Sequence, residues 1–157
     1  MKKKLFGIII SIIFICMLFA GCTDKIPYEI INFPLGAPVS EIDYKTQMFK
    51  YNSYGEFELG ISKFNKIDND LIEVTTIDEE IFTDALLIHV VVYHTSSDVP
   101  NIKNIYKKEN SVIVEINVSY PNSVQTEDEV FTHYFIKIER TEINSDTEFI
   151  LNGNYKI

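Results

Sequence analysis

Residues 86–93 read Leu-Leu-Ile-His-Val-Val-Val-Tyr, a continuous apolar run that is interrupted only by His89. Three consecutive valines favour a strand over a helix, because β-branched side chains fit a pleated surface and crowd a helical turn. The run does not alternate between apolar and polar residues, as the strand of a half-exposed sheet would. This stretch therefore predicts a β-strand that is buried on both of its faces.

The chain that follows predicts further strands. Val112–Tyr120 alternates between apolar and polar residues, which is typical of a strand with one buried face. Residues 102–107 are separated from it by Lys-Glu-Asn-Ser, so the two segments are expected to form a hairpin. Val130–Arg140 predicts another strand. The apolar residues expected to share one face are Val112, Val114, Ile116, Val118 and Tyr120 in the first strand, and Val130, Tyr134, Ile136 and Ile138 in the other.

The C-terminal segment predicts a second hairpin. Phe149–Leu151 and Tyr155–Ile157 flank Asn152-Gly153-Asn154, and Asn-Gly is a strong signal for a tight turn between strands. Earlier in the chain, Tyr44–Tyr51 is rich in residues that strands favour. In Phe57–Ile61 the apolar residues alternate with polar ones, which also indicates a strand.

Helix signals are few. Asp78–Glu80 places carboxylates where a helix N-terminus would have unpaired amides, and Ile81, Phe82 and Ala85 follow as its buried stripe. Residues 61–71 offer a second helix, although their composition is more typical of a loop. The sequence predicts a mainly β domain of the α+β class, an antiparallel sheet with one or two short helices.

The N-terminus predicts an export signal. Lys2–Lys4 precede an apolar run from Leu5 to Ala20, and the run ends on Leu-Phe-Ala-Gly followed by Cys22. A charged start, a short apolar core and small residues before a cysteine indicate a lipoprotein signal that is cleaved before Cys22, whose sulfur then carries the lipid. The alternatives are an uncleaved membrane anchor, for which the run is short, and an ordinary signal peptide.

We therefore expect a signal peptide over 1–21, a proline-containing tether over 22–41 and a single β-rich domain over 42–157. Of the charged residues, all 23 acidic ones and 11 of the 14 basic ones follow Cys22, so the mature chain carries a net charge of −12. Phosphate backbones repel such a chain, which argues against nucleic acid as a partner. The expected location is the outer face of the cell membrane, with the membrane contacted through the lipid on Cys22.

No pattern in the chain predicts catalysis, a metal or a cofactor. Cys16 leaves with the signal and Cys22 is consumed by the lipid, so no thiol remains for chemistry. His89 and His94 point to opposite faces of one strand, and His133 is expected on the more exposed face of its own. The chain contains no His-x-His or His-Glu-x-x-His sequence, and no serine has the surroundings of a nucleophile elbow.

Aromatic residues provide the candidate interaction surface, because the chain has nine tyrosines and eleven phenylalanines but no tryptophan. Two groups could form an exposed binding patch. The alternative is that both faces of the sheet are covered and these residues are core, and we favour it. The candidate residues are Tyr51, Tyr54 and Phe57 in the first group, and Phe131, His133 and Phe135 in the second.

The order of these segments resembles a known family. It is formed by residues 78–88 with the turn at 95–100, by residues 104–108 and 112–121, and by the closing strand 132–140. This order is similar to small lipoproteins of Gram-positive bacteria related to the C-terminal domain of the protease-complex subunit PrcB, over roughly residues 76–141. The resemblance implies an accessory or interaction role beside a surface protein rather than catalysis.

The expected function is that of a cell-surface lipoprotein acting as a non-enzymatic protein-interaction or accessory module, with a surface or exported protein as partner. The first alternative is a lipid-anchored binding protein for a cationic small molecule or a metal ion, using the acidic surface. A hydrolase is the third possibility. An interaction module predicts shallow surfaces, whereas a solute binder predicts an enclosed cavity and an enzyme predicts converging titratable groups.

Overall fold

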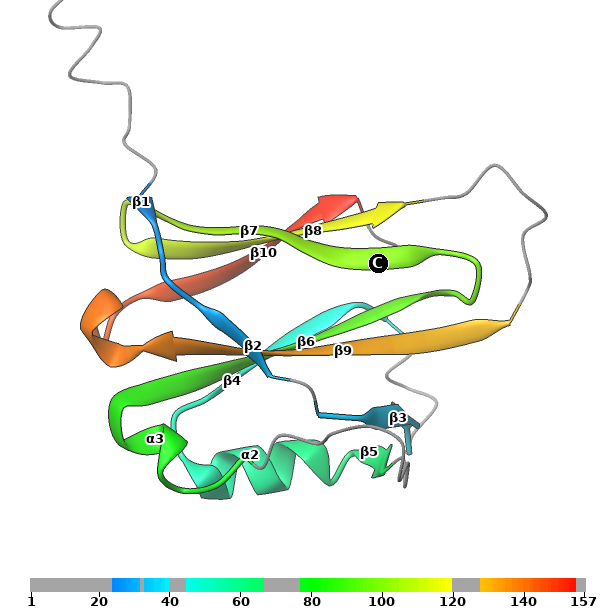
Figure 1. Ribbon diagram of the computed structural model, residues 1–157, viewed down its shortest axis with the longest axis horizontal. Coiled ribbons are helices and arrows are strands. Elements are labelled where there is room, and N and C mark those ends of the chain that lie inside the picture. The colour runs from blue at the N-terminus through cyan, green and yellow to red at the C-terminus, as the bar shows by residue number, and fades with distance from the viewer. Residues whose placement is uncertain (1–23, 32, 40–44, 67–76, 120–127, 155–157) are drawn as a thin grey trace, which may run out of the picture.

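The computed structural model describes residues 24–31, 33–39, 45–66, 77–119 and 128–154. The predicted signal segment and Cys22 lie outside these residues. Within them the protein is mainly β, as predicted, with two short α-helices and sheets whose strand pairs are antiparallel except for β8 (Ser111–Ser119) with β10 (Glu148–Asn154). The layers are a four-stranded sheet, a second four-stranded sheet packed beneath it, and a cover of helices and one small sheet beneath both (Figure 1).

The upper sheet has the order β1-β7-β8-β10, and the central sheet has the order β2-β9-β6-β4. In the upper sheet the strands are β1 (Asp24–Lys25), β7 (Val99–Lys108), β8 (Ser111–Ser119) and β10 (Glu148–Asn154). In the central sheet they are β2 (Glu29–Ile31), β9 (Glu129–Glu139), β6 (Ala85–Thr95) and β4 (Gln47–Tyr51). The cover consists of α2 (Tyr54–Ile61), α3 (Ile81–Asp84) and the pair β3 (Leu35–Pro38) and β5 (Phe64–Lys66), and a short 3-10 helix η2 (Arg140–Glu142) follows β9.

Strand β6 is buried on both faces, which confirms the prediction for residues 86–93. Alternate side chains of a strand point to opposite sides. One set faces the upper sheet and lies in a core with β8 and β9; its members on β6 are Leu86, Ile88, Val90 and Val92. The other set includes Leu87 and Val91 and lies in a second core against the cover layer. The continuous apolar run is therefore explained by two packed neighbours.

The predicted hairpin is also confirmed, since β7 and β8 pair antiparallel around a turn that contains Glu109 at a φ of 56°. Val112, Val114, Ile116 and Val118 are all buried on the inner face of β8. The helix predicted after Asp78–Glu80 is present as α3, and it buries Phe82.

Residues 54–61 form a helix, so the strand expected over Phe57–Ile61 is wrong. Ser53 caps α2 by accepting a hydrogen bond from the Glu56 amide at 3.3 Å, and the Glu56 carboxylate accepts one from the Asn52 amide at 2.7 Å. This Ser-x-x-Glu spacing is a capping-box signal. Phe57 and Ile61, one helical turn apart, are the buried residues of α2. Alternation over five residues was outweighed by this cap.

The tether predicted over 22–41 needs correction, because three of its segments belong to the folded domain. β1 pairs with β7, β2 pairs with β9, and β3 pairs with β5. Ile26, Ile31 and Leu35 are buried, each at 4% exposure. Prolines that indicated a linker are compatible with short edge strands, where a missing amide proton costs little.

The turn predicted at Asn152-Gly153 is also wrong. β10 continues through both residues to Asn154 and pairs parallel with β8, so that Gly153 lies opposite Ile116. Gly153 has a φ of +150°, and a Cβ at this position would overlap with the carbonyl oxygen of Ile116. The glycine is required for close approach of two strands rather than for a turn. The second half of the expected hairpin, 155–157, lies outside the described residues.

Candidate functional site

The two main sheets are joined on one side and open on the other. On the joined side, the chain passes from β1 in the upper sheet to β2 in the central sheet through Ile26 (Figure 1). On the open side lie β4 and β10, the last strands of their sheets. No other strand of the described chain pairs with their outer edges. The open side therefore exposes two strand edges at the rim of the hydrophobic core.

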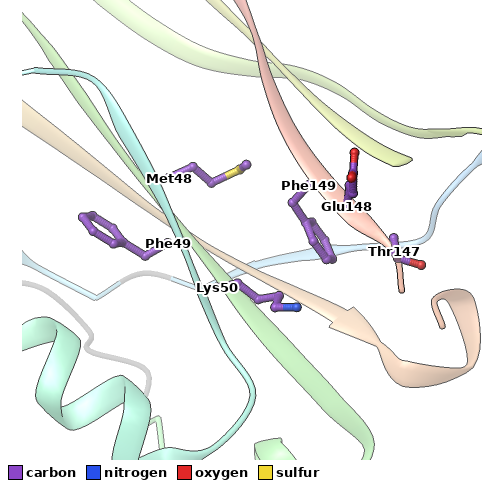
Figure 2. A pocket seen from close by; sticks show the side chains of 6 residues that line it. All are labelled: Met48, Phe49, Lys50, Thr147, Glu148 and Phe149. Carbon is purple, nitrogen blue, oxygen red and sulfur yellow. The ribbon is translucent and has the colours of Figure 1, made fainter. Parts of the chain in front are cut away.

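A groove of about 400 Å³ lies between these two edges, and we call it the edge groove. Its lining residues are Met48, Phe49, Lys50, Thr147, Glu148 and Phe149 (Figure 2). A second hollow of about 290 Å³ shares Lys50 and Phe149 with it and reaches Arg140. The two hollows thus line the open side of the sandwich as one shallow surface.

Lys50 lines the edge groove on the face of β4 that is turned toward the upper sheet. Met48 and Lys50 have the same parity on β4, and Met48 packs against the core between the sheets. The Lys50 ammonium lies 5.5 Å from the centre of the Phe149 ring (Figure 2), within range of a cation–π interaction. Lys50 itself is exposed, so its charge remains in contact with solvent beside the ring.

A second lysine lies on the opposite face of β4. Phe49 points away from the upper sheet and packs against the cover layer. The Lys63 ammonium lies 5.9 Å from the centre of its ring. Lys45, just before β4, is exposed as well. Strand β4 thus has a lysine ammonium on each face, from Lys50 on one and from Lys63 on the other.

The ends of the groove are held by hydrogen bonds. The Thr147 hydroxyl donates to the side-chain oxygen Oδ1 of Asn144 at 2.7 Å. The backbone N–H of Asn144 donates back to that hydroxyl at 3.0 Å. Arg140 donates from Nη2 to the carbonyl oxygen of Asn52 at 2.6 Å, which ties the chain after β9 to the end of β4. These contacts order the turn before β10 and hold the chain after β9 against the end of β4.

The predicted aromatic surface is not exposed, and the structure corrects it. Tyr51, Phe57 and Phe135 are buried at 5%, 2% and 0% exposure. Tyr54, Phe131 and His133 are partly buried. All but His133 are part of the core between the central sheet and the cover layer, and α2 and the β3–β5 pair cover them. The alternative interpretation, that these residues are core, is therefore correct for the buried three.

His133, which was expected on an exposed face, belongs to a buried hydrogen-bond chain. The Gly36 carbonyl can only accept, so Nε2 of His133 donates to it at 3.1 Å. Nδ1 of His133 then accepts from Nε2 of His89 at 2.9 Å, and Nδ1 of His89 accepts from the Tyr51 hydroxyl at 3.1 Å. Each ring nitrogen has a partner, and both imidazoles are neutral in this arrangement.

Burial keeps this chain neutral. Desolvation lowers the pKa of His89 well below 6.5, and the nearby His133 lowers it further. Desolvation also lowers the pKa of His133 to about 4, against a smaller opposing effect of its hydrogen bond to Gly36. The pKa of the Tyr51 hydroxyl is raised by burial. We assign these three residues to the packing of the cover layer onto the central sheet.

His94 points to the other face of β6, as predicted, and its ring nitrogens bond to the Thr132 hydroxyl and the Thr95 carbonyl, both at 2.7 Å.

An acid-lined hollow of about 400 Å³ lies beside α3, and Lys137 lines it too, 3.8 Å from both Glu29 and Glu139. Across the described part of the chain, no three His, Cys, Asp or Glu side chains are grouped as metal ligands.

The fold and the groove define the class of protein: a mainly β domain with two main sheets and an open edge groove. Comparison of the chain with protein-family models, curated proteins and solved structures finds no match. Among the helices that the structure describes, none has the length and apolar character to cross a membrane.

The edge groove was not predicted from the sequence. Its residues fall in segments that were identified as strands, but a strand that ends a sheet has the same local pattern as one inside it. The one available signal was Lys50, a charged residue within a short strand, which is a common device of edge strands.

Proposed function

We propose that the mature protein is a lipid-anchored module on the outer face of the cell membrane that acts by binding another protein and catalyses no reaction. The observation that supports this proposal best is the open side of the sandwich. Two strand edges border a shallow groove there, and strand edges are ready templates for pairing with another chain. The resemblance of residues 76–141 to the PrcB C-terminal family fits an accessory role of this kind.

The features that would favour the other functions are weaker. The acid-lined hollow beside α3 is open, and a cation bound there would compete with the Lys137 ammonium for Glu139. Of the two histidines with strongly lowered pKa values, His89 is fully buried, and both bond within the protein. Neither arrangement offers a convergent set of groups to a substrate.

The proposal is tested by chemical crosslinking on intact cells that produce the protein, followed by mass spectrometry of the crosslinked peptides. The matched control joins the same signal and lipidated cysteine to an unrelated soluble domain. We expect a protein that is crosslinked to lysines of residues 24–154 and is absent from the control. Identical crosslinks in both samples would show that only the shared anchor brings neighbours together, and would refute the proposal.

The anchor has its own prediction. Cys22→Ser is expected to abolish the lipid-dependent mass increase of the mature N-terminus, because the sulfur that carries the lipid is missing. The matched control is Cys16→Ser, which changes a cysteine within the apolar run and should leave the lipid in place. Mass spectrometry of the purified proteins reads out both. A lipid on the Cys22→Ser protein would contradict the lipoprotein assignment.

A further inference from the structure

We propose that the outer edge of β4 at Met48–Lys50 binds an extended, acidic segment of the partner protein, which adds to the central sheet as a further strand. This inference rests on the proposed function and names the site and the chemistry of the partner. The site is the outer edge of β4 at Met48–Lys50, beside which no other described strand pairs, together with the edge groove. The occupant is a peptide strand that carries a carboxylate opposite Lys50.

The geometry of β4 determines what such a strand would meet. Residues directly opposite each other on paired strands point to the same face of the sheet. A partner residue opposite Lys50 would therefore face the edge groove, beside Lys50 and the Phe149 ring. Its neighbours along the partner strand would face the other side, where the Lys63 ammonium lies over Phe49. Carboxylates on either face would thus find a lysine.

Charge also selects the partner. The whole chain has a net charge of −9, whereas the charged residues that line the two hollows of the open side are Lys50, Arg140 and Glu148. Lys63 and the exposed Lys45 add positive charge beside β4. This is a cationic edge on an acidic molecule, and it complements an acidic strand. An acidic partner held elsewhere would be repelled by most of the surface.

A different role for Lys50 must be separated from this one. A lysine within an edge strand can simply discourage the pairing of two sheets. Under that role the edge of β4 binds no acidic strand, and reversing the charge of Lys50 changes no binding. The two roles therefore predict opposite outcomes with an added peptide.

The test uses three defined seven-residue peptides and the ¹⁵N-labelled mature chain carrying Cys22→Ser. The first peptide alternates valine and glutamate, the second alternates valine and lysine, and the third is the first with every backbone amide methylated, so that neither of its edges can donate to β4. We expect only the first to shift the amide signals of residues 47–51. Lys50→Glu should weaken that binding about fivefold or more.

The matched control is Lys25→Glu, which makes the same charge change on exposed β1 at the joined side; it should bind as the unaltered chain does. Failure of the valine–glutamate peptide to shift residues 47–51 would overturn the inference. So would equal binding of the valine–lysine or methylated peptide, or equal effects of Lys50→Glu and Lys25→Glu.

A photo-crosslinking residue in the full chain on cells separates this inference from the proposed function. It is placed at exposed Glu148 in the groove or at Val99, which is 60% exposed on β7. The strand-binding site is supported if a partner is captured from position 148 and if Lys50→Glu abolishes that capture. Capture from position 99 alone keeps the proposed function and overturns the site, whereas capture from neither position, together with a negative crosslinking result, overturns both.

Discussion

Lowering the pH from 6.5 to 5 is expected to reduce the free energy of unfolding by about 2 kcal/mol for each histidine of the His89–His133 pair that stays neutral in the folded protein. Burial holds the pKa of His133 at about 4 and that of His89 well below 6.5 when folded. The unfolded chain, whose histidines titrate near 6.5, therefore binds more protons in this window. The contribution of this pair to the free energy of unfolding is fully present above about pH 6.5 and is lost as the pH falls toward 4.

Urea unfolding of the mature chain carrying Cys22→Ser, measured by circular dichroism at several pH values between 7 and 5, checks this prediction. The control replaces the hydrogen-bonded set together, as Tyr51→Phe with His89→Phe and His133→Phe, so that no side-chain partner is left unpaired. Its stability should vary much less across the same window, whatever its absolute value. An equally steep dependence in the control would show that other groups cause the acid sensitivity.

Gly153→Ala is expected to lower the free energy of unfolding by about 3 kcal/mol, because it combines backbone strain with a steric overlap. Gly153 has a φ of +150°, which side-chain-bearing residues rarely adopt. An added Cβ would also overlap with the Ile116 carbonyl oxygen across the β8–β10 pair. Backbone atoms cannot move aside as a flexible side chain can, so the two strands would have to separate.

Gly55→Ala is the matched control, since it adds the same methyl group elsewhere in the chain. Gly55 lies in the first turn of α2, and a Cβ there would have no atom within 4 Å. Alanine is expected to leave stability unchanged or to raise it by up to about 1 kcal/mol, because it favours the helix. Urea unfolding at neutral pH compares the two variants. Equal effects would contradict the close approach of β10 to β8.

Local patterns predicted the strands whose side chains follow a simple period. The continuous run at 86–93 and the alternation at 112–118 identified β6 and β8 with their buried faces. The same reasoning failed at Phe57–Ile61, where the helix cap at Ser53 outweighed a short alternation of apolar and polar residues. It failed again at Asn152-Gly153, because a glycine needed for close packing has the same local appearance as a glycine in a turn.

The candidate site could not be read from the sequence. Lys50 lies far along the chain from Arg140 and Phe149, and each of the three has an ordinary local context. The aromatic residues that looked like a surface became core because α2 and the β3–β5 pair cover them. Burial of the second face of the sheet depended on which distant segment packed against it.

Local patterning was enough to predict that this protein is mainly β, that β6 is buried on both faces and which residues of β8 face the core, because side-chain direction in a strand follows from its period of two. No local pattern revealed that β1, β2 and β3 join the sheets, that β10 pairs parallel with β8, or that β6 is the single described strand paired with β4. These outcomes depend on pairings between distant segments. Backbone hydrogen bonds of that kind are available to almost any strand, so local sequence does not choose among them.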